Sequence, residues 1–88
     1  MNLANDTIII YGTTWCGDCR RTRAFLDGKQ IAYQWVDIDR DSEGGAYVEQ
    51  VNHGCRSVPT IVFPNGDVLV EPSTSQLVDR FGVPAAQN

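Results

Sequence analysis

The chain has 88 residues, the length of one domain, and we expect a single domain over residues 1–88. Seven Lys and Arg residues against eleven Asp and Glu residues give a net charge of −4, which argues against a nucleic-acid partner and against an anionic membrane surface. The hydrophobic fraction of 42% indicates a folded globule, and three cysteines cannot all pair within a secreted disulfide scaffold. Composition therefore favours a cytoplasmic protein whose cysteines do chemistry or bind metal.

The first predicted elements are a strand over residues 7–11 and a helix over residues 16–27. The strand is β-branched and aromatic without polar alternation, which is typical of a strand covered on both faces. The inner face of the helix, at spacings of three and four residues, consists of Cys19, Thr22, Phe25 and Leu26. Its outer side carries Arg20, Arg21 and Arg23. Gly28 is expected to end the helix as its C′ residue.

A second strand and a second helix are predicted over residues 32–38 and about 43–53. Side chains alternate along the strand, which is typical of a sheet strand. The inner face of the helix would consist of Tyr47, Val48 and Val51. Gly44 and Gly45 each disfavour a helix by about 1 kcal/mol relative to Ala. Gly54 would close the helix.

Two short strands, over residues 60–63 and 68–71, are predicted to form an antiparallel hairpin. Pro64-Asn65-Gly66-Asp67 lies between them. Asn-Gly is a strong signal for a tight hairpin turn.

The last predicted helix begins after Ser73, because Ser73 as N-cap and Gln76 three residues later form a capping box. Its apolar face consists of Leu77, Val78 and Phe81. Gly82 and Pro84 would stop it. The element order is then β-α-β-α-β-β-α, with the first two strands parallel because a helix joins them. We predict an α/β fold in which one four-stranded mixed sheet carries helices on its faces.

The sequence Cys16-Gly17-Asp18-Cys19 places two thiols where the first strand gives way to the first helix. A helix N-terminus presents unpaired N–H groups and partial positive charge, which stabilise a thiolate, the nucleophilic form of cysteine. Cys19, one turn further along, could attack a mixed disulfide formed at Cys16. Asp18 opposes this stabilisation, whereas Arg20 and Arg21 add positive charge nearby. The pattern favours dithiol redox chemistry.

The alternative for the cysteine pair is a metal site. Zinc takes about four ligands, and His53 and Cys55 would complete a set of four with Cys16 and Cys19. Zinc pairs usually lie on tight turns rather than at the start of an amphipathic helix, so the redox interpretation is favoured. Zinc, or an Fe–S cluster held through the same cysteines, remains the competing class.

The sequence from about residue 7 to residue 81 resembles the glutaredoxin-like branch of the thioredoxin superfamily. The matching motifs are Tyr11-Gly12-Thr13-Thr14-Trp15-Cys16-Gly17-Asp18-Cys19, Arg56-Ser57-Val58-Pro59-Thr60 and Phe63-Pro64-Asn65-Gly66. Within the branch, Val51-Asn52-His53-Gly54 and Glu71-Pro72-Ser73 are most similar to the mycoredoxins of actinobacteria. The resemblance implies a thioredoxin-like fold with helices on both faces of the sheet.

The resemblance also implies roles for site residues. Cys16 would be the attacking thiol and Cys19 the resolving thiol. Pro59 would be a cis proline that turns the Val58 backbone toward Cys16, where it could pair with an extended substrate. The other groove residues implied are Thr14, Trp15 and Arg56, the last of which could meet a carboxylate or a sugar oxygen.

Two departures from the family concern glutathione. Many glutathione-using members have Pro-Tyr or Pro-Phe between the cysteines, where this chain has Gly17-Asp18. They also carry a Gly-Gly…Asp motif before the last helix, where this chain has Val70-Glu71-Pro72-Ser73. These departures disfavour glutathione, and the resemblance to mycoredoxins makes mycothiol the favoured small thiol, with glutathione second and direct reduction by a thioredoxin reductase third.

Other residues have simpler interpretations. We expect Cys55 to be a small, partly buried side chain rather than a third redox thiol. His53 is expected to interact with a helix C-terminus. The acidic cluster that follows the second strand, Asp37, Asp39 and Asp41, is expected to be a solvated strand end rather than a Ca²⁺ loop. Tyr33 and Trp35 are expected to pack.

The sequence thus predicts a thiol–disulfide oxidoreductase that reduces protein disulfides or mixed disulfides with a low-molecular-weight thiol. No bound cofactor and no metal are expected. The expected partners are disulfide-containing proteins, mycothiol or glutathione, and a flavoprotein reductase. We expect a monomer.

Overall fold

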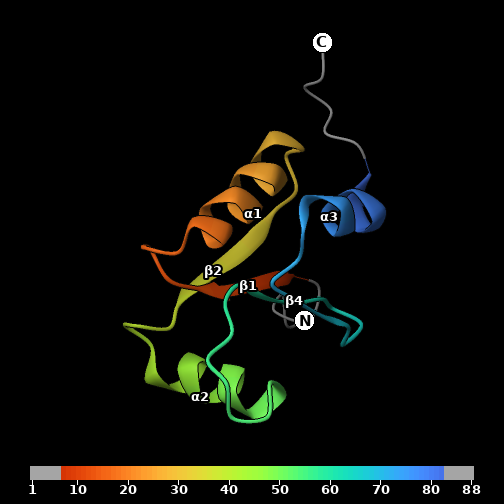
Figure 1. The fold of residues 1–88 in the computed structure, drawn as a ribbon. Coiled ribbons are helices and arrows are strands. Elements are labelled where there is room, and N and C mark those ends of the chain that lie inside the picture. Colours follow the sequence, from red (N-terminus) through yellow and green to blue (C-terminus); the bar gives the residue numbers. More distant parts are fainter. Residues whose placement is uncertain (1–6, 83–88) are drawn as a thin grey trace.

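The computed structural model describes residues 7–82, which form one mixed sheet and three helices. In chain order the elements are β1 (Ile8–Gly12), α1 (Gly17–Gly28), β2 (Tyr33–Asp37), α2 (Ser42–Val51), β3 (Thr60–Val62), β4 (Val68–Val70) and α3 (Thr74–Phe81) (Figure 1). The strand order is β2-β1-β3-β4. The pair β1–β2 is parallel, whereas β1–β3 and β3–β4 are antiparallel. The predicted element order and strand directions are confirmed.

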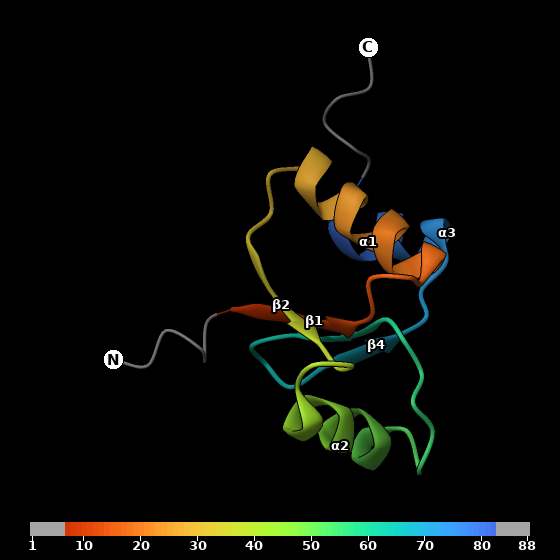
Figure 2. The same ribbon diagram turned by 90° about the vertical axis from the view of Figure 1, so that its left-hand side faces the viewer.

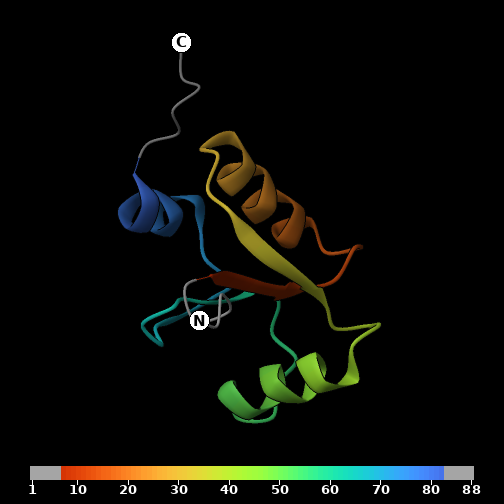
Figure 3. The same ribbon diagram turned by 180° about the vertical axis from the view of Figure 1, so that it is seen from behind.

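The helices lie on both faces of the sheet, as predicted. Helices α1 and α3 share one face and α2 covers the other, which the views from the side and from behind both show (Figures 2 and 3). None of the helices in the described range is long and apolar enough to cross a membrane.

The larger core lies between the sheet and the α1/α3 face. Its buried members are Ile10, Leu26, Ile61, Phe63 and Leu77. Phe81 closes the end of this core, because its ring centroid lies 5.7 Å from that of Phe63 and 6.4 Å from that of Phe25. Tyr33 and Trp35 pack against the same cluster, which confirms their predicted packing role.

Helix α2 contains two glycines, and both allow close contacts with neighbouring side chains. A Cβ at Gly44 would lie 2.8 Å from Cγ1 of Val36, and one at Gly45 would lie 3.0 Å from Nη1 of Arg56. The helix N-cap is Asp41, whose Oδ1 accepts a hydrogen bond from Gly44 N at 2.9 Å. One member of the acidic cluster therefore caps a helix, which the sequence interpretation missed.

The helix ends differ in detail from the predicted ones. Gly28 is still helical, so its predicted C′ role is wrong, and the left-handed residue that follows is Gln30, with φ 59°. After α2 the chain turns through His53 and Gly54, with φ 57° and 95°. The predicted stop at Pro84 lies outside the described residues.

The predicted capping box of α3 is present. Ser73 Oγ accepts a hydrogen bond from Gln76 N at 3.1 Å, and Gln76 Oε1 accepts one from Ser73 N at 2.8 Å. Just upstream, Glu71 has φ 47°, a left-handed conformation that disfavours residues with a Cβ. Its N–H donates to Pro59 O at 2.8 Å, which holds the chain in this conformation.

Replacing Glu71 by Gly is expected to stabilise the fold by about 1 kcal/mol, because Gly adopts positive φ without the strain that a Cβ brings. Urea unfolding followed by circular dichroism measures the change. The matched control is Glu43→Gly in the first turn of α2, where the same substitution should destabilise by up to about 1 kcal/mol. Equal destabilisation by both substitutions would contradict strain at Glu71.

Candidate functional site

The two cysteines of the C-x-x-C motif lie at the start of α1 in different environments. Cys16 is the N-cap of the helix, with extended backbone angles of φ −85° and ψ 119°. Its Sγ accepts a hydrogen bond from Cys19 N at 3.2 Å, so the sulfur takes the position that a Ser or Asp oxygen usually takes. Cys16 is partly exposed, whereas Cys19 is fully buried. The helix start thus presents one accessible sulfur with a second directly behind it.

Burial keeps the Cys19 thiol protonated. Its pKa is raised to about 12, first because the charged form would be desolvated and second through the hydrogen bond with Cys16. The end of β1 closes over this sulfur, because a Cβ at Gly12 would lie only 2.6 Å from Cys19 Sγ and 2.8 Å from the Trp35 ring. Gly12 is therefore the residue that allows strand and thiol to approach this closely.

The backbone before β3 faces the accessible sulfur. The Val58–Pro59 peptide bond is cis, as the resemblance implies. Cys16 Sγ lies 3.9 Å from Val58 O, within reach of a weak thiol hydrogen bond. Pro59 itself is buried. The structure therefore brings together Cys16, Cys19, Val58 and Pro59 from two distant segments of the chain.

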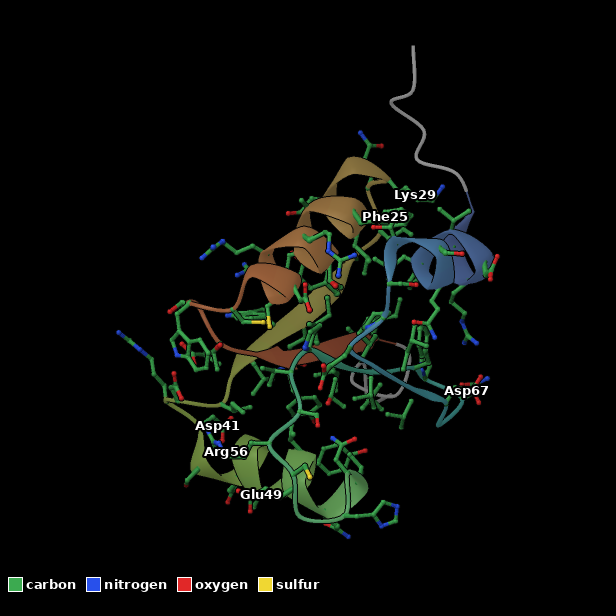
Figure 4. The ribbon with its side chains drawn as sticks, viewed as in Figure 1. Phe25, Lys29, Asp41, Glu49, Arg56 and Asp67 are labelled. Carbon is green, nitrogen blue, oxygen red and sulfur yellow. The ribbon has the colours of Figure 1, made fainter. Side chains whose placement is uncertain are left out.

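Trp15 and Arg56 flank this centre and meet at one carboxylate. The Trp15 side chain is 69% exposed, and its Nε1 donates to Asp39 Oδ2 at 2.8 Å. Arg56 Nη2 lies 3.4 Å from Asp39 Oδ1, and its Nη1 lies 4.0 Å from Glu49 Oε2. Figure 4 shows Arg56 and Glu49 together at α2, on the side of the sheet opposite α1. Thr14 is exposed beside Trp15.

Sequence reasoning missed Asp39 and Glu49 as neighbours of the site. Asp39 was expected to belong to a solvated strand end, yet it lies between an indole N–H and a guanidinium. The acidic cluster was the only signal in the sequence. Its partners lie 24 and 17 residues away along the chain, so no local pattern reveals the contacts.

Arg20 and Arg21 of α1 contact neighbouring segments of the chain. Arg20 Nη1 donates to Thr14 O at 3.2 Å. Arg21 bridges to the start of α3, donating to Thr74 Oγ1 at 2.9 Å and to Pro72 O at 3.3 Å. Arg21 also pairs with Asp18 at 3.1 Å, so the acidic residue of the motif is matched by a cation.

The four residues of the zinc alternative do not form a group. Within residues 7–82, no set of three or more His, Cys, Asp and Glu side chains is placed to hold a metal ion. His53 and Cys55 are both exposed, in the turn that follows α2. The expectation that Cys55 is partly buried is therefore wrong, because the tight left-handed turn after α2 carries its side chain outward.

Comparison with known proteins identifies relatives of this arrangement. The family model described as Glutaredoxin matches residues 8–69. The chain is 40% identical over 70 residues to a Mycobacterium tuberculosis protein named "Putative glutaredoxin", covering 80% of this chain and 83% of that one. It is 37% identical over 74 residues to Mycoredoxin 1 of Corynebacterium glutamicum, covering 84% and 91% respectively.

Solved structures show the same fold. The crystal structure of a glutaredoxin from Methanosarcina mazei is similar with a TM-score of 0.70 at 23% identity, covering 90% of this chain and 81% of that one. The buckwheat glutaredoxin–glutathione complex is similar with a TM-score of 0.66 at 26% identity, covering 85% and 69%. The thioredoxin-like fold implied by the sequence is confirmed.

The environments of Cys19 and Cys55 predict how iodoacetamide labels these two thiols. At about pH 8, Cys19 should stay unlabelled in the reduced, folded protein, because its buried thiol is protonated and only thiolates react. Its labelling should rise as the pH approaches the raised pKa of about 12 or when the protein unfolds. Peptide mass spectrometry measures the labelling, with exposed Cys55 as the internal control. Labelling of Cys19 as fast as Cys55 would contradict the burial.

Proposed function

Because this chain belongs to the glutaredoxin family, whose members are thiol–disulfide oxidoreductases, we propose that it reduces mixed disulfides between proteins and mycothiol. The observation that carries the proposal is the asymmetry of the motif. Cys16 presents an accessible sulfur that accepts an N–H hydrogen bond, and Cys19 lies buried behind it. Cys16 would therefore be the attacking thiol, and Cys19 would be the resolving thiol that reacts afterwards.

In the first step, the Cys16 thiolate attacks the small-thiol sulfur of a protein mixed disulfide. A new disulfide forms between Cys16 and the small thiol, and the protein cysteine leaves as a thiolate that takes up a proton. The Cys19 N–H, at the N-terminal end of α1, donates its hydrogen bond to the sulfur that makes this attack. Gly17 has no side chain to obstruct the incoming disulfide, since even a Cβ there would have no neighbour within 4 Å.

In the second step, Cys16 is restored. A second small thiol can attack the mixed disulfide, leaving as the oxidised dimer of the small thiol while Cys16 regains its thiol. Alternatively, Cys19 loses its proton, attacks Cys16 and expels the small thiol, and two reducing equivalents from small thiols or a flavoprotein reductase reopen the internal disulfide. Once Cys16 is in a disulfide, its charge and its hydrogen bond no longer raise the pKa of Cys19, which favours this attack.

Substrate would bind in the groove beside Cys16. Val58 would pair with an extended substrate in a strand-like manner, over the buried ring of Pro59. Thr14 and Trp15 would form the opposite edge. Arg56 would contribute to recognition at the far end of the groove.

Mycothiol is favoured as the small thiol for two reasons. One is the similarity to Mycoredoxin 1 of Corynebacterium glutamicum. The other is the start of α3, where Ser73 and Gln76 satisfy each other and Arg21 contacts Thr74. These contacts occupy donors and acceptors at the place where glutathione-using members of the family carry the Gly-Gly…Asp motif, which disfavours glutathione.

Glutathione is the second candidate thiol, and direct reduction by a thioredoxin reductase is the third. A structural relative, the buckwheat glutaredoxin, is known as a complex with glutathione. We propose that the protein acts as a monomer in the cytoplasm, where its three free cysteines stay reduced.

Reduction of the oxidised protein should be fastest with mycothiol. Equal concentrations of mycothiol and glutathione, and a thioredoxin reductase with NADPH, are compared by the rate at which the two active-site thiols reappear. We expect a mycothiol preference of about 10-fold or more. Equal or faster reduction by glutathione or by the reductase would assign the protein to that system instead.

Cys19→Ser tests the dithiol route. The variant should lose about 10-fold or more of its rate on an intramolecular protein disulfide, because no second thiol can release the mixed disulfide with the protein. Mass spectrometry should detect that trapped mixed disulfide on Cys16. Cys55→Ser is the matched control and should match the wild-type rate. Full activity in Cys19→Ser would show that Cys19 is dispensable.

A further inference from the structure

Among the described residues three threonines are buried, and two of them have a hydroxyl without a partner. Thr22 is 0% exposed and Thr13 is 2% exposed, and within residues 7–82 neither Oγ1 makes a hydrogen bond. Thr60 is the contrast, because its Oγ1 donates to Ser57 O at 2.7 Å and accepts from Asn52 Nδ2 at 3.2 Å. Most buried hydroxyls are paired in this way, since an unpaired one loses its hydrogen bonds to water on folding. The two unpaired hydroxyls therefore call for an explanation.

Thr13 is in contact with the buried thiol. Its backbone makes a hydrogen bond to Cys19 that lowers the pKa of this thiol. A hydrogen bond that favours the charged sulfur is one that the sulfur accepts, so the Thr13 N–H is the donor. The hydroxyl oxygen of a threonine is separated from its own backbone nitrogen by Cα and Cβ only. The buried Thr13 hydroxyl therefore lies near the same sulfur.

Thr22 lies near the same thiol along α1. It follows Cys19 by three residues, and side chains at this spacing are neighbours on one helix face, with Cβ atoms about 5–6 Å apart. The Cα–Cβ bonds of a helix tilt toward its N-terminus, so the Thr22 side chain lies over the turn that contains Cys19. Both side chains are fully buried. Cys19 thus has one unpaired hydroxyl near it on α1 and another just after β1.

The resolving step needs hydrogen-bond donors at this place. Cys19 must become a thiolate to attack, and burial raises its pKa to about 12. Its titratable neighbours, Cys16 and Asp18, raise the pKa further, so the described part of the chain offers this thiolate no cation. A hydroxyl can turn about its C–O bond to donate to a new acceptor, and an unpaired hydroxyl breaks no existing bond in doing so. Thr13 and Thr22 carry donors of this kind.

We propose that the Thr13 and Thr22 hydroxyls donate hydrogen bonds to the Cys19 sulfur as it takes on negative charge, and thereby speed the resolving step. Each hydroxyl keeps its own proton. The Cys19 proton passes to the small thiol that leaves, and the Cys16–Cys19 bond forms as the bond from Cys16 to the small thiol breaks. The inference rests on the proposed function, because it concerns the dithiol route. In the reduced protein the same hydroxyls have no acceptor.

A two-step reaction with dithiodipyridine measures the resolving step by itself. The protein is reduced and carries Cys55→Ser, so that the exposed third thiol does not react. Attack by Cys16 on the reagent releases a first thiopyridone, at a rate that depends on the reagent concentration. Attack by Cys19 on the resulting mixed disulfide releases a second thiopyridone, at a rate that does not. Stopped-flow absorbance separates the two releases.

Thr22→Val and Thr13→Val keep the shape of the side chain and remove the hydroxyl. At a pH below the midpoint of the second release, we expect each substitution to slow this release about 10-fold. The midpoint should rise by about one pH unit, because the thiolate loses a donor. The first release should stay within about twofold of wild type. The melting temperature should equal or exceed that of wild type, because an unpaired buried hydroxyl is replaced by a methyl group.

Thr22→Ser is the matched control, because it keeps the hydroxyl and removes the methyl group. Its second release should stay within about threefold of wild type, although the lost methyl group lowers its melting temperature. Slowing as large as in Thr22→Val would show that packing rather than the hydroxyl matters, and would overturn the role of Thr22. Melting of both valine variants clearly below wild type would show that the hydroxyls are paired at rest, and would overturn the inference.

The second release also separates this inference from the proposed function. A wild-type second release that neither valine substitution slows would overturn the role of the hydroxyls and leave the dithiol route standing. Slowing in one valine variant alone would assign the role to that hydroxyl and overturn it for the other. Absence of a second release in wild-type protein would show that Cys19 does not resolve, and the dithiol route would fail together with this inference.

Discussion

The hydrogen bond from Cys19 N to Cys16 Sγ is the contact on which the site depends. A helix needs a side-chain acceptor at its N-cap, and here that acceptor is the sulfur that the proposed chemistry uses. Cys19 follows Cys16 by three residues, so the two thiols lie about one helical turn apart. Because α1 packs on β1 and β2 through Leu26, the core of the sheet fixes the direction in which the cap points. Formation of α1 therefore also places the two thiols.

A second constraint follows from where β1 ends. Gly12 brings the strand against Cys19 Sγ, which buries that thiol and keeps it protonated. Cys16, only three residues away, stays partly exposed because the N-cap residue lies outside the first helical turn. The difference in exposure between the two thiols thus follows from one glycine and one cap position.

Local signals in the sequence predicted much of this arrangement. The capping box at Ser73, the Asn65-Gly66 turn and the motif at Cys16 each act over a few residues, so spacing alone identifies them. The contacts that the sequence did not predict join segments far apart in the chain. The pairing of Trp15 and Arg56 at Asp39 exists only after α2 folds back beside β2. The exposure of Cys55 follows a left-handed turn after α2. A histidine such as His53 gives no sequence signal for left-handed backbone.

The distribution of charge explains why the acidity of the protein does not gather at the C-x-x-C motif. Asp18 is paired with Arg21, and Asp39 and Glu49 share Arg56, so these three carboxylates are matched by cations. The net charge of −4 therefore does not concentrate at the reactive sulfur. Exposed pairs of this kind add little to stability, on the order of 0–1 kcal/mol each.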